Sequence, residues 1–201
     1  MRKTYVALCR GVAPEHGRIN VRLKTISTVT RHFAVPHPGG KDAVTEFKRL
    51  ALLQQPSLSA GHGVADAIGS SSSAYSLLLV TPVTGRMHQI RAHLNHIGHP
   101  LDGDGRCALQ PPALLLFVPQ SAALNIRYAP RGRGGQASQP SRLFLHSASV
   151  CASFETADCN MWCIRAIAEL PLQLKQRLAA LGGQTLDAEI SRLVAAAVQH
   201  V

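Results

Sequence analysis

The stretch from residue 75 to residue 105 constrains this chain more than any other. It begins as an alternating apolar run, which predicts a β-strand, and the alternation breaks at Thr84 and Gly85. Apolar residues then recur at spacings of three and four, at Met87, Ile90, Leu94 and Ile97. This period predicts one buried face of a helix of about three turns. Gly98 followed by Pro100 predicts the end of that helix.

Arg91 lies at the edge of the apolar face of this predicted helix. An arginine in such a position can lay its aliphatic stem over apolar neighbours while its planar head binds a carboxylate with two hydrogen bonds. We therefore expect Arg91 to be half buried.

The string TGRMHQIRAHLNHIGHP (residues 84–100), followed by Gly103 and Asp104, resembles the signature of the RluA-type RNA pseudouridine synthases. Further blocks resemble that family and follow its order, namely RKTYVALCRG (2–11), KDAVTEFKRL (41–50), LFLHSASVCASF (143–154) and ELPLQLKQRLAALG (169–182). The resemblance covers most of residues 2–182.

The pattern of strands and helices predicts an α+β fold, in which the signature helix and the C-terminal helices pack on a mixed, largely antiparallel sheet. We expect the strands of that sheet around Tyr5, Ile19, Val44, Tyr75, Phe144 and Ile164. Residues 1–182 should form a pseudouridine synthase-like domain that lacks its N-terminal part. Two stretches, 54–74 and 120–141, are predicted insertions, and residues 183–201 are a predicted helical extension.

The resemblance implies isomerisation of uridine to pseudouridine in structured RNA, either rRNA or tRNA. The N1–C1′ glycosidic bond must break and the base must rejoin through C5, so the uridine has to leave its stack and enter a pocket. In the family an aspartate acts as the nucleophile, an arginine pairs with it, and a tyrosine stacks on the base.

Arg91 and Tyr5 match the arginine and the tyrosine of that site. The alternative for Tyr5 is an ordinary strand tyrosine packed in the core. Residues expected to contact the RNA are Arg86, His88, Gln89 and Lys41. The resemblance implies no metal and no organic cofactor.

The family aspartate lies in an Arg-Leu-Asp motif upstream of the K-x-Y strand, and this chain begins with that strand. None of its aspartates follows Arg-Leu: these are Asp42, Asp66, Asp102, Asp104, Asp158 and Asp187. We therefore expect the chain alone to be catalytically silent. It is either the C-terminal portion of an active synthase, which the retention of Arg91 and Tyr5 favours, or a non-catalytic RNA-binding or ribosome-assembly protein.

Without its carboxylate partner, Arg91 is expected to face a cleft and to be free to bind water or an anion. Replacing Arg91 by Met should then destabilise the chain by less than about 1 kcal/mol. The alternative is that Arg91 pairs with a local acid, such as Asp102 or Asp104, and serves the fold alone.

The charge balance predicts a polyanionic partner, because 21 Lys and Arg stand against 11 Asp and Glu. Structured RNA is the expected partner, with ribosomal or assembly proteins as further candidates. Part of the charge forms a basic series, Arg18, Arg22, Lys24 and Arg31, which is either a solvated surface or a set of phosphate contacts. No apolar run is long enough to span a membrane, so we expect an intracellular protein, with cytosol, mitochondrion and nucleus left open.

Cysteine and histidine patterns do not predict a metal site. The five cysteines are odd in number and form no C-x-x-C pair, so reduced thiols are expected. His93, His96 and His99 recur at spacings of three, but no carboxylate stands in a zincin-like position beside them.

Overall fold

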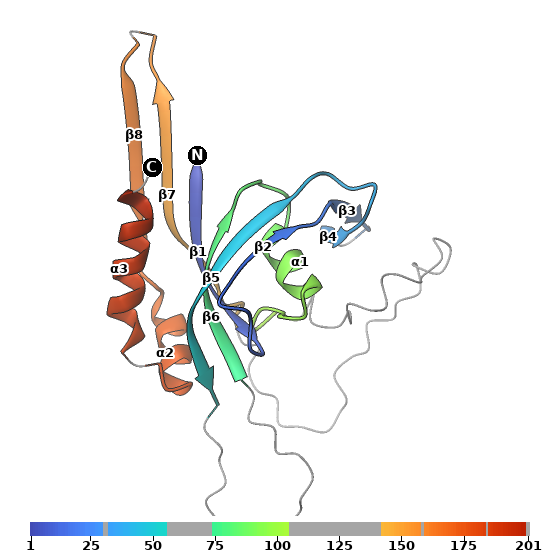
Figure 1. Ribbon diagram of the computed structural model, residues 1–201, viewed down its shortest axis with the longest axis vertical. Helices are drawn as coiled ribbons and strands as arrows, with labels where there is room; N and C mark the ends of the chain where they lie inside the picture. Colours follow the sequence, from blue (N-terminus) through green and yellow to red (C-terminus); the bar gives the residue numbers. More distant parts are fainter. Residues whose placement is uncertain (30–31, 56–73, 105–141, 158, 184, 200–201) are drawn as a thin grey trace, which may run out of the picture.

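A computed structural model describes most of the chain (Figure 1). The described residues are 1–29, 32–55, 74–104, 142–157, 159–183 and 185–199. The predicted insertion 120–141 lies outside them, as does nearly all of the predicted insertion 54–74. No helix of the described residues has the length and apolar character needed to cross a membrane.

One antiparallel sheet of six strands forms the centre of the fold, in the order β2-β5-β6-β1-β7-β8. Its strands are β1 (Arg2–Arg10), β2 (His16–Asn20), β5 (Val44–Gln54), β6 (Ala74–Pro82), β7 (Leu145–Glu155) and β8 (Met161–Ile167). The six positions around which strands are expected from the sequence all lie in this sheet or, for Phe144, immediately before β7. The predicted α+β fold with a largely antiparallel sheet is therefore confirmed.

Strand β1 lies inside the sheet and carries core residues on both faces. Because successive side chains of a strand point to opposite faces, Val6 and Leu8 pack into one apolar cluster while Ala7 and Cys9 pack into another. All four are fully buried. The two clusters are covered by different helices.

Helices α2 (Leu172–Ala180) and α3 (Leu186–Gln199) cover the face of Val6 and Leu8 (Figure 1). Their buried contacts come from residues at helical spacing, Leu174, Leu178, Ile190 and Val194. Gly182, with φ of 81°, ends α2. The predicted C-terminal extension thus packs into the same cluster as the rest of the fold.

Helix α1 (Gln89–His96) covers the opposite face through Ile90 and Leu94. It has eight residues and is shorter than the predicted three turns. Met87 lies before the helix and is 46% exposed, because His88 adopts a left-handed conformation with φ of 49° and the helix begins only after it. Gly98, with φ of 85°, ends the helix region as predicted.

A separate two-stranded hairpin, β3 (Leu23–Ser27) and β4 (His32–Pro36), lies beside α1 (Figure 1). It is attached through Leu23 and Lys41, whose backbone groups exchange hydrogen bonds of 2.9 and 2.8 Å. Leu23 also packs with Ala92 of α1. The hairpin lacks a clear apolar alternation, since four of the five β3 residues are exposed, and the sequence therefore did not predict it.

Candidate functional site

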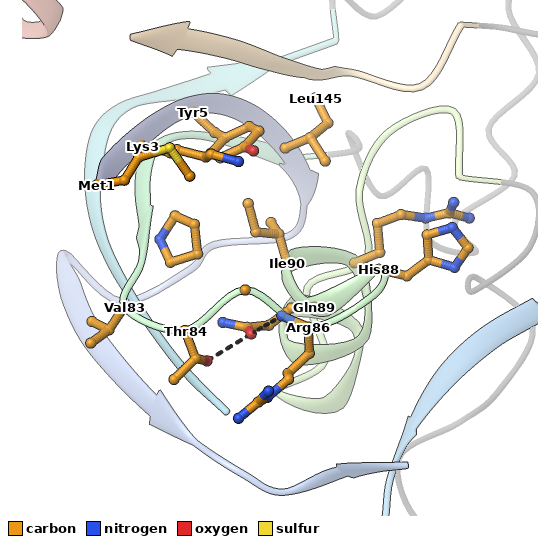
Figure 2. A pocket seen from close by; sticks show the side chains of 13 residues that line it. Met1, Lys3, Tyr5, Val83, Thr84, Arg86, His88, Gln89, Ile90 and Leu145 are labelled. Carbon is orange, nitrogen blue, oxygen red and sulfur yellow. Dashed lines mark hydrogen bonds between the residues drawn. The ribbon is translucent and has the colours of Figure 1, made fainter. Parts of the chain in front are cut away.

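A cavity of about 400 Å³ lies between β1, the loop that follows β6, and the start of α1. Figure 2 shows Tyr5 and Leu145 on the opposite side from Thr84 and Arg86, with Ile90 between them. Tyr5 is half buried, and its ring both packs against the core cluster of α1 and lines the cavity. The two alternatives for Tyr5 are therefore compatible.

Arg91 lines the same cavity and is held by Asp104. Its Nε donates to Asp104 Oδ2 at 2.8 Å and its Nη2 donates to Oδ1 at 2.7 Å, a bidentate pair. The two side chains are 12% and 1% exposed. The expectation that Arg91 is free to bind an anion is therefore wrong, because a local acid binds its guanidinium. The alternative, that Arg91 pairs with a local acid, is confirmed, and that acid is Asp104.

Gln89 fixes the loop that forms the lower wall of the cavity. Its Oε1 accepts hydrogen bonds from the Thr84 hydroxyl at 2.7 Å and from the Arg86 backbone N–H at 2.9 Å (Figure 2). Its Nε2 donates to Val44 O and to Thr45 Oγ1, both at 2.9 Å. All four hydrogen-bonding positions of the amide are thereby used.

Gln89 is also only 4% exposed. Gln89 lines the first cavity, but its buried amide has no further donor or acceptor to offer, and its contact with RNA stays a prediction. Its role is to join the loop after β6 to strand β5.

His93 continues the same network into the core. The Val21 carbonyl can only accept, so in the neutral ring the proton is on His93 Nε2, and Nδ1 accepts from the Thr45 hydroxyl at 2.8 Å. His93 Nε2 then donates to the carbonyl of Val21 at 2.9 Å. Burial of the ring lowers the pKa of His93 below its usual 6.5, against the opposing effect of the Val21 carbonyl. His93 is a neutral structural residue here, and no group of three or more potential metal ligands occurs among the described residues.

The remaining predicted contacts are divided between two cavities. His88 is half buried and lines the first cavity. Lys41 lines a second cavity of about 450 Å³, bounded by β3, residues 39–41 and residues 85–87. Arg86 lines both cavities.

The structure separates the members of the basic series that the sequence could not rank. Arg18 pairs with Glu46 at 2.7 Å and Arg22 pairs with Asp42 at 3.0 Å. Lys24 lines the second cavity instead. Arg31 lies outside the described residues.

No aspartate or glutamate of the described residues lines the first cavity. Asp104 binds Arg91, which lines the cavity, but the Asp104 side chain is itself almost wholly buried. The cavity therefore offers an aromatic ring, apolar walls and a guanidinium that is held in place. These groups suit a flat polar ring better than a cationic ligand.

Comparison with known proteins finds similarity to RNA pseudouridine synthases. Residues 1–96 match the family described as RNA pseudouridylate synthase. The tRNA pseudouridine synthase C of Pectobacterium carotovorum subsp. carotovorum is 37% identical over 106 residues, which cover 52% of this chain and 26% of the relative. An uncharacterized RNA pseudouridine synthase of Helicobacter pylori is 34% identical over 131 residues, covering 64% and 46%. The chain thus spans less than half of the length of these relatives.

Two solved human structures share the fold. RNA Pseudouridylate Synthase Domain Containing 1 superposes with a TM-score of 0.50 at 22% identity, covering 85% of this chain and 55% of that one. RNA Pseudouridylate Synthase Domain Containing 4 gives a TM-score of 0.50 at 19% identity, covering 90% and 62%.

Proposed function

We propose that this chain, whose residues 1–96 match the family of RNA pseudouridylate synthases, is part of an enzyme that isomerises uridine to pseudouridine in structured RNA. tRNA is the favoured substrate over rRNA, since relatives from Pectobacterium and Haemophilus ducreyi are named tRNA pseudouridine synthase C. The formal charge of +10 supports a nucleic-acid partner.

The observation that carries this proposal is that Tyr5 and Arg91, which are distant in the sequence, line the same cavity. Its volume of about 400 Å³ lies within the range of roughly 300–1,000 Å³ usual for small-ligand sites. The Tyr5 ring offers a stacking surface for a uracil turned out of its helix. Ile90 and Leu145 add apolar surface to the wall of this cavity.

The reaction also needs a carboxylate nucleophile at C1′, so that the bond to N1 can break and the bond to C5 can form. Asp104 does not fill this role, because its side chain is 1% exposed and does not line the first cavity. We assign the nucleophile to a carboxylate that is not among the described residues.

A second candidate is a non-catalytic RNA-binding or ribosome-assembly protein. It is favoured by one observation, the lack of an acidic side chain among the described residues that line the first cavity. Such a protein would still bind RNA through the same surface, so binding alone does not separate the two candidates.

The experiment that separates them supplies the nucleophile. The pure chain is incubated with tRNA, alone and as a fusion to the N-terminal segment of a relative that carries the Arg-Leu-Asp motif, and pseudouridine is mapped chemically. We expect no conversion by the chain alone and site-specific conversion by the fusion. Conversion by the chain alone would refute the missing nucleophile, and a silent fusion that still binds tRNA would support the second candidate.

Tyr5 provides the internal check on this experiment. In the fusion, Tyr5→Phe should retain most of the conversion because it keeps the stacking face, whereas Tyr5→Ala should lose nearly all of it. Lys48→Gln is the matched control, since Lys48 is exposed on β5 and lines neither cavity. Equal activity of the Ala and Phe variants would exclude base stacking as the role of Tyr5.

A further inference from the structure

The second cavity gathers three cations from segments that are distant in the sequence: Lys24 of β3, Lys41 after β4, and Arg86 after β6. The cavity depends on a close backbone approach. A Cβ on Gly40 would lie 2.4 Å from the carbonyl carbon of Leu23, so no side chain fits there without moving the hairpin. The hairpin and residues 39–41 therefore form one continuous wall that places Lys24 and Lys41 together.

The charge of this cavity is not balanced within the described part of the chain. Lys24, Lys41 and Arg86 have no ion pair there. The acid beside them, Asp42, pairs with Arg22 through its carboxylate, while its backbone carbonyl accepts from Arg86 Nε at 2.9 Å. Arg86 is thus oriented by a neutral acceptor and keeps its full charge at the cavity.

The two cavities share a wall. Gly85 and Arg86 line both of them, and the Arg86 backbone N–H is fixed by Gln89 at 2.9 Å. A nucleic-acid strand that crosses this wall would present a base on one side and its sugar-phosphate backbone on the other. Among the described residues no aromatic side chain lines the second cavity, so this cavity suits the charged backbone better than a second base.

We propose that the second cavity binds a backbone phosphate of the same RNA strand whose uridine enters the first cavity, through Lys24, Lys41 and Arg86. This inference rests on the proposed function and adds to it the position of the strand. Lysine supplies a compact charge on a flexible stem, which suits a phosphate whose exact position varies among RNAs. The second cavity therefore fixes the register of the strand, and the first cavity selects the base.

The test compares the full chain with Lys24→Gln, Lys41→Gln and the double variant, using fluorescent tRNA as the probe at several salt concentrations. Each lost phosphate contact should lower the slope of log affinity against log salt by about 0.7 to 0.9. The double variant should also bind on the order of tenfold more weakly at physiological salt. Lys48→Gln removes the same charge from an exposed position on β5, outside both cavities, and should leave the slope unchanged.

The outcomes distinguish this inference from the function on which it rests. If the wild-type chain binds tRNA and both cavity variants behave like Lys48→Gln, the phosphate site is excluded and the proposed function stands. If the wild-type chain binds neither tRNA nor rRNA, both fall. Competition by poly-L-glutamate as effective as competition by unlabelled tRNA at equal charge would assign the cavity to an acidic protein partner and overturn the RNA assignment. All variants are first compared by thermal melting, where their exposed positions predict no change.

Discussion

Arg91 and Asp104 form a bidentate ion pair at the wall of the first cavity, with the carboxylate 1% exposed. The pair links α1 to the turn that contains Gly103, which has a φ of 76°. Arg91 therefore has a structural partner before any substrate or nucleophile arrives.

Replacing Arg91 by Met should strongly destabilise the chain. The change leaves the buried Asp104 carboxylate without its counter-charge, and such losses lower the free energy of unfolding by about 3 to 5 kcal/mol. This predicted loss is larger than the loss of less than about 1 kcal/mol that the sequence suggested for an unpaired arginine. Urea unfolding monitored by circular dichroism measures it.

The matched control is Arg18→Met, which breaks the exposed pair with Glu46 and should lower the free energy of unfolding by less than about 1 kcal/mol. The double variant Arg91→Met with Asp104→Leu removes both charges and should recover part of the loss. An Arg91→Met chain as stable as Arg18→Met would contradict the assignment of Arg91 to the fold.

Replacing Gln89 by Glu should separate the loop after β6 from strand β5. A carboxylate has no proton to donate, so the hydrogen bonds to Val44 O and Thr45 Oγ1 would be lost and a charged oxygen would lie next to these two oxygen atoms. Leaving buried polar groups unsatisfied lowers the free energy of unfolding by about 1 to 3 kcal/mol, and by more when a charge is involved.

Gln173→Glu is the control for this prediction. Gln173 is exposed and accepts from Arg142 Nη1 at 3.1 Å, so a carboxylate there keeps its partner. Thermal melting should show a clear fall for Gln89→Glu and almost none for Gln173→Glu. Equal melting temperatures would mean that the Gln89 network contributes nothing to stability.

The stability of the chain should fall as the pH drops below 6.5 because of His93. Burial lowers the folded-state pKa of His93 below 6.5, the value that applies to the unfolded chain. Above pH 6.5 both states are neutral and no effect arises. Below it the unfolded state binds a proton that the folded state does not, so stability is lost at up to about 1.4 kcal/mol per pH unit until the folded-state pKa is reached.

The pH profile of urea unfolding between pH 8 and pH 5 tests this prediction. His93→Gln should have a shallower acid slope than the wild type, whatever its absolute stability. His16→Gln, at an exposed position of β2, should keep the wild-type slope. A His93→Gln slope as steep as that of the wild type would assign the acid sensitivity to other groups.

The strands and the site differ in how well the sequence predicted them. The expected strand positions lie in or next to all six strands of the sheet. Apolar alternation is clear where a strand is buried, as in β6, whereas every residue of β8 is exposed. The hairpin β3–β4 escaped notice, since it is attached mainly by backbone hydrogen bonds between Leu23 and Lys41 and by small side chains such as Ala34. Backbone contacts leave no period in the sequence.

The site residues were predicted by motif, but the sequence named Asp104 only as one of two alternative partners for Arg91. The spacing of 13 residues between Arg91 and Asp104 carries no helical or strand relationship, and only the turn at Gly103 brings them together. The spacing within the signature placed Gln89 beside the cavity but could not show that its side chain points into the core. The sequence did not distinguish Lys24 from the other cations of the basic series. The structure does so, because Arg18 and Arg22 form ion pairs with nearby acids.

The last prediction concerns thiol reactivity in the hairpin of β7 and β8. Cys163 and Cys151 lie on these neighbouring strands with their sulfur atoms 3.6 Å apart. A hydrogen bond from Arg165, followed by the contact with Cys151, lowers the pKa of the exposed Cys163 thiol. A larger thiolate fraction at neutral pH makes a cysteine a better nucleophile toward alkylating reagents. Burial raises the pKa of Cys9 to about 12, which keeps that thiol protonated and inert.

Alkylation by iodoacetamide at pH 7.5, followed by peptide mass spectrometry, should therefore label Cys163 before the exposed Cys159, and Cys9 only after unfolding. Arg165→Gln should slow the labelling of Cys163 severalfold and leave Cys159 unchanged, because only the first thiol bonds to the guanidinium. Labelling of Cys163 no faster than that of Cys159 in the wild-type chain would show that Arg165 does not activate it.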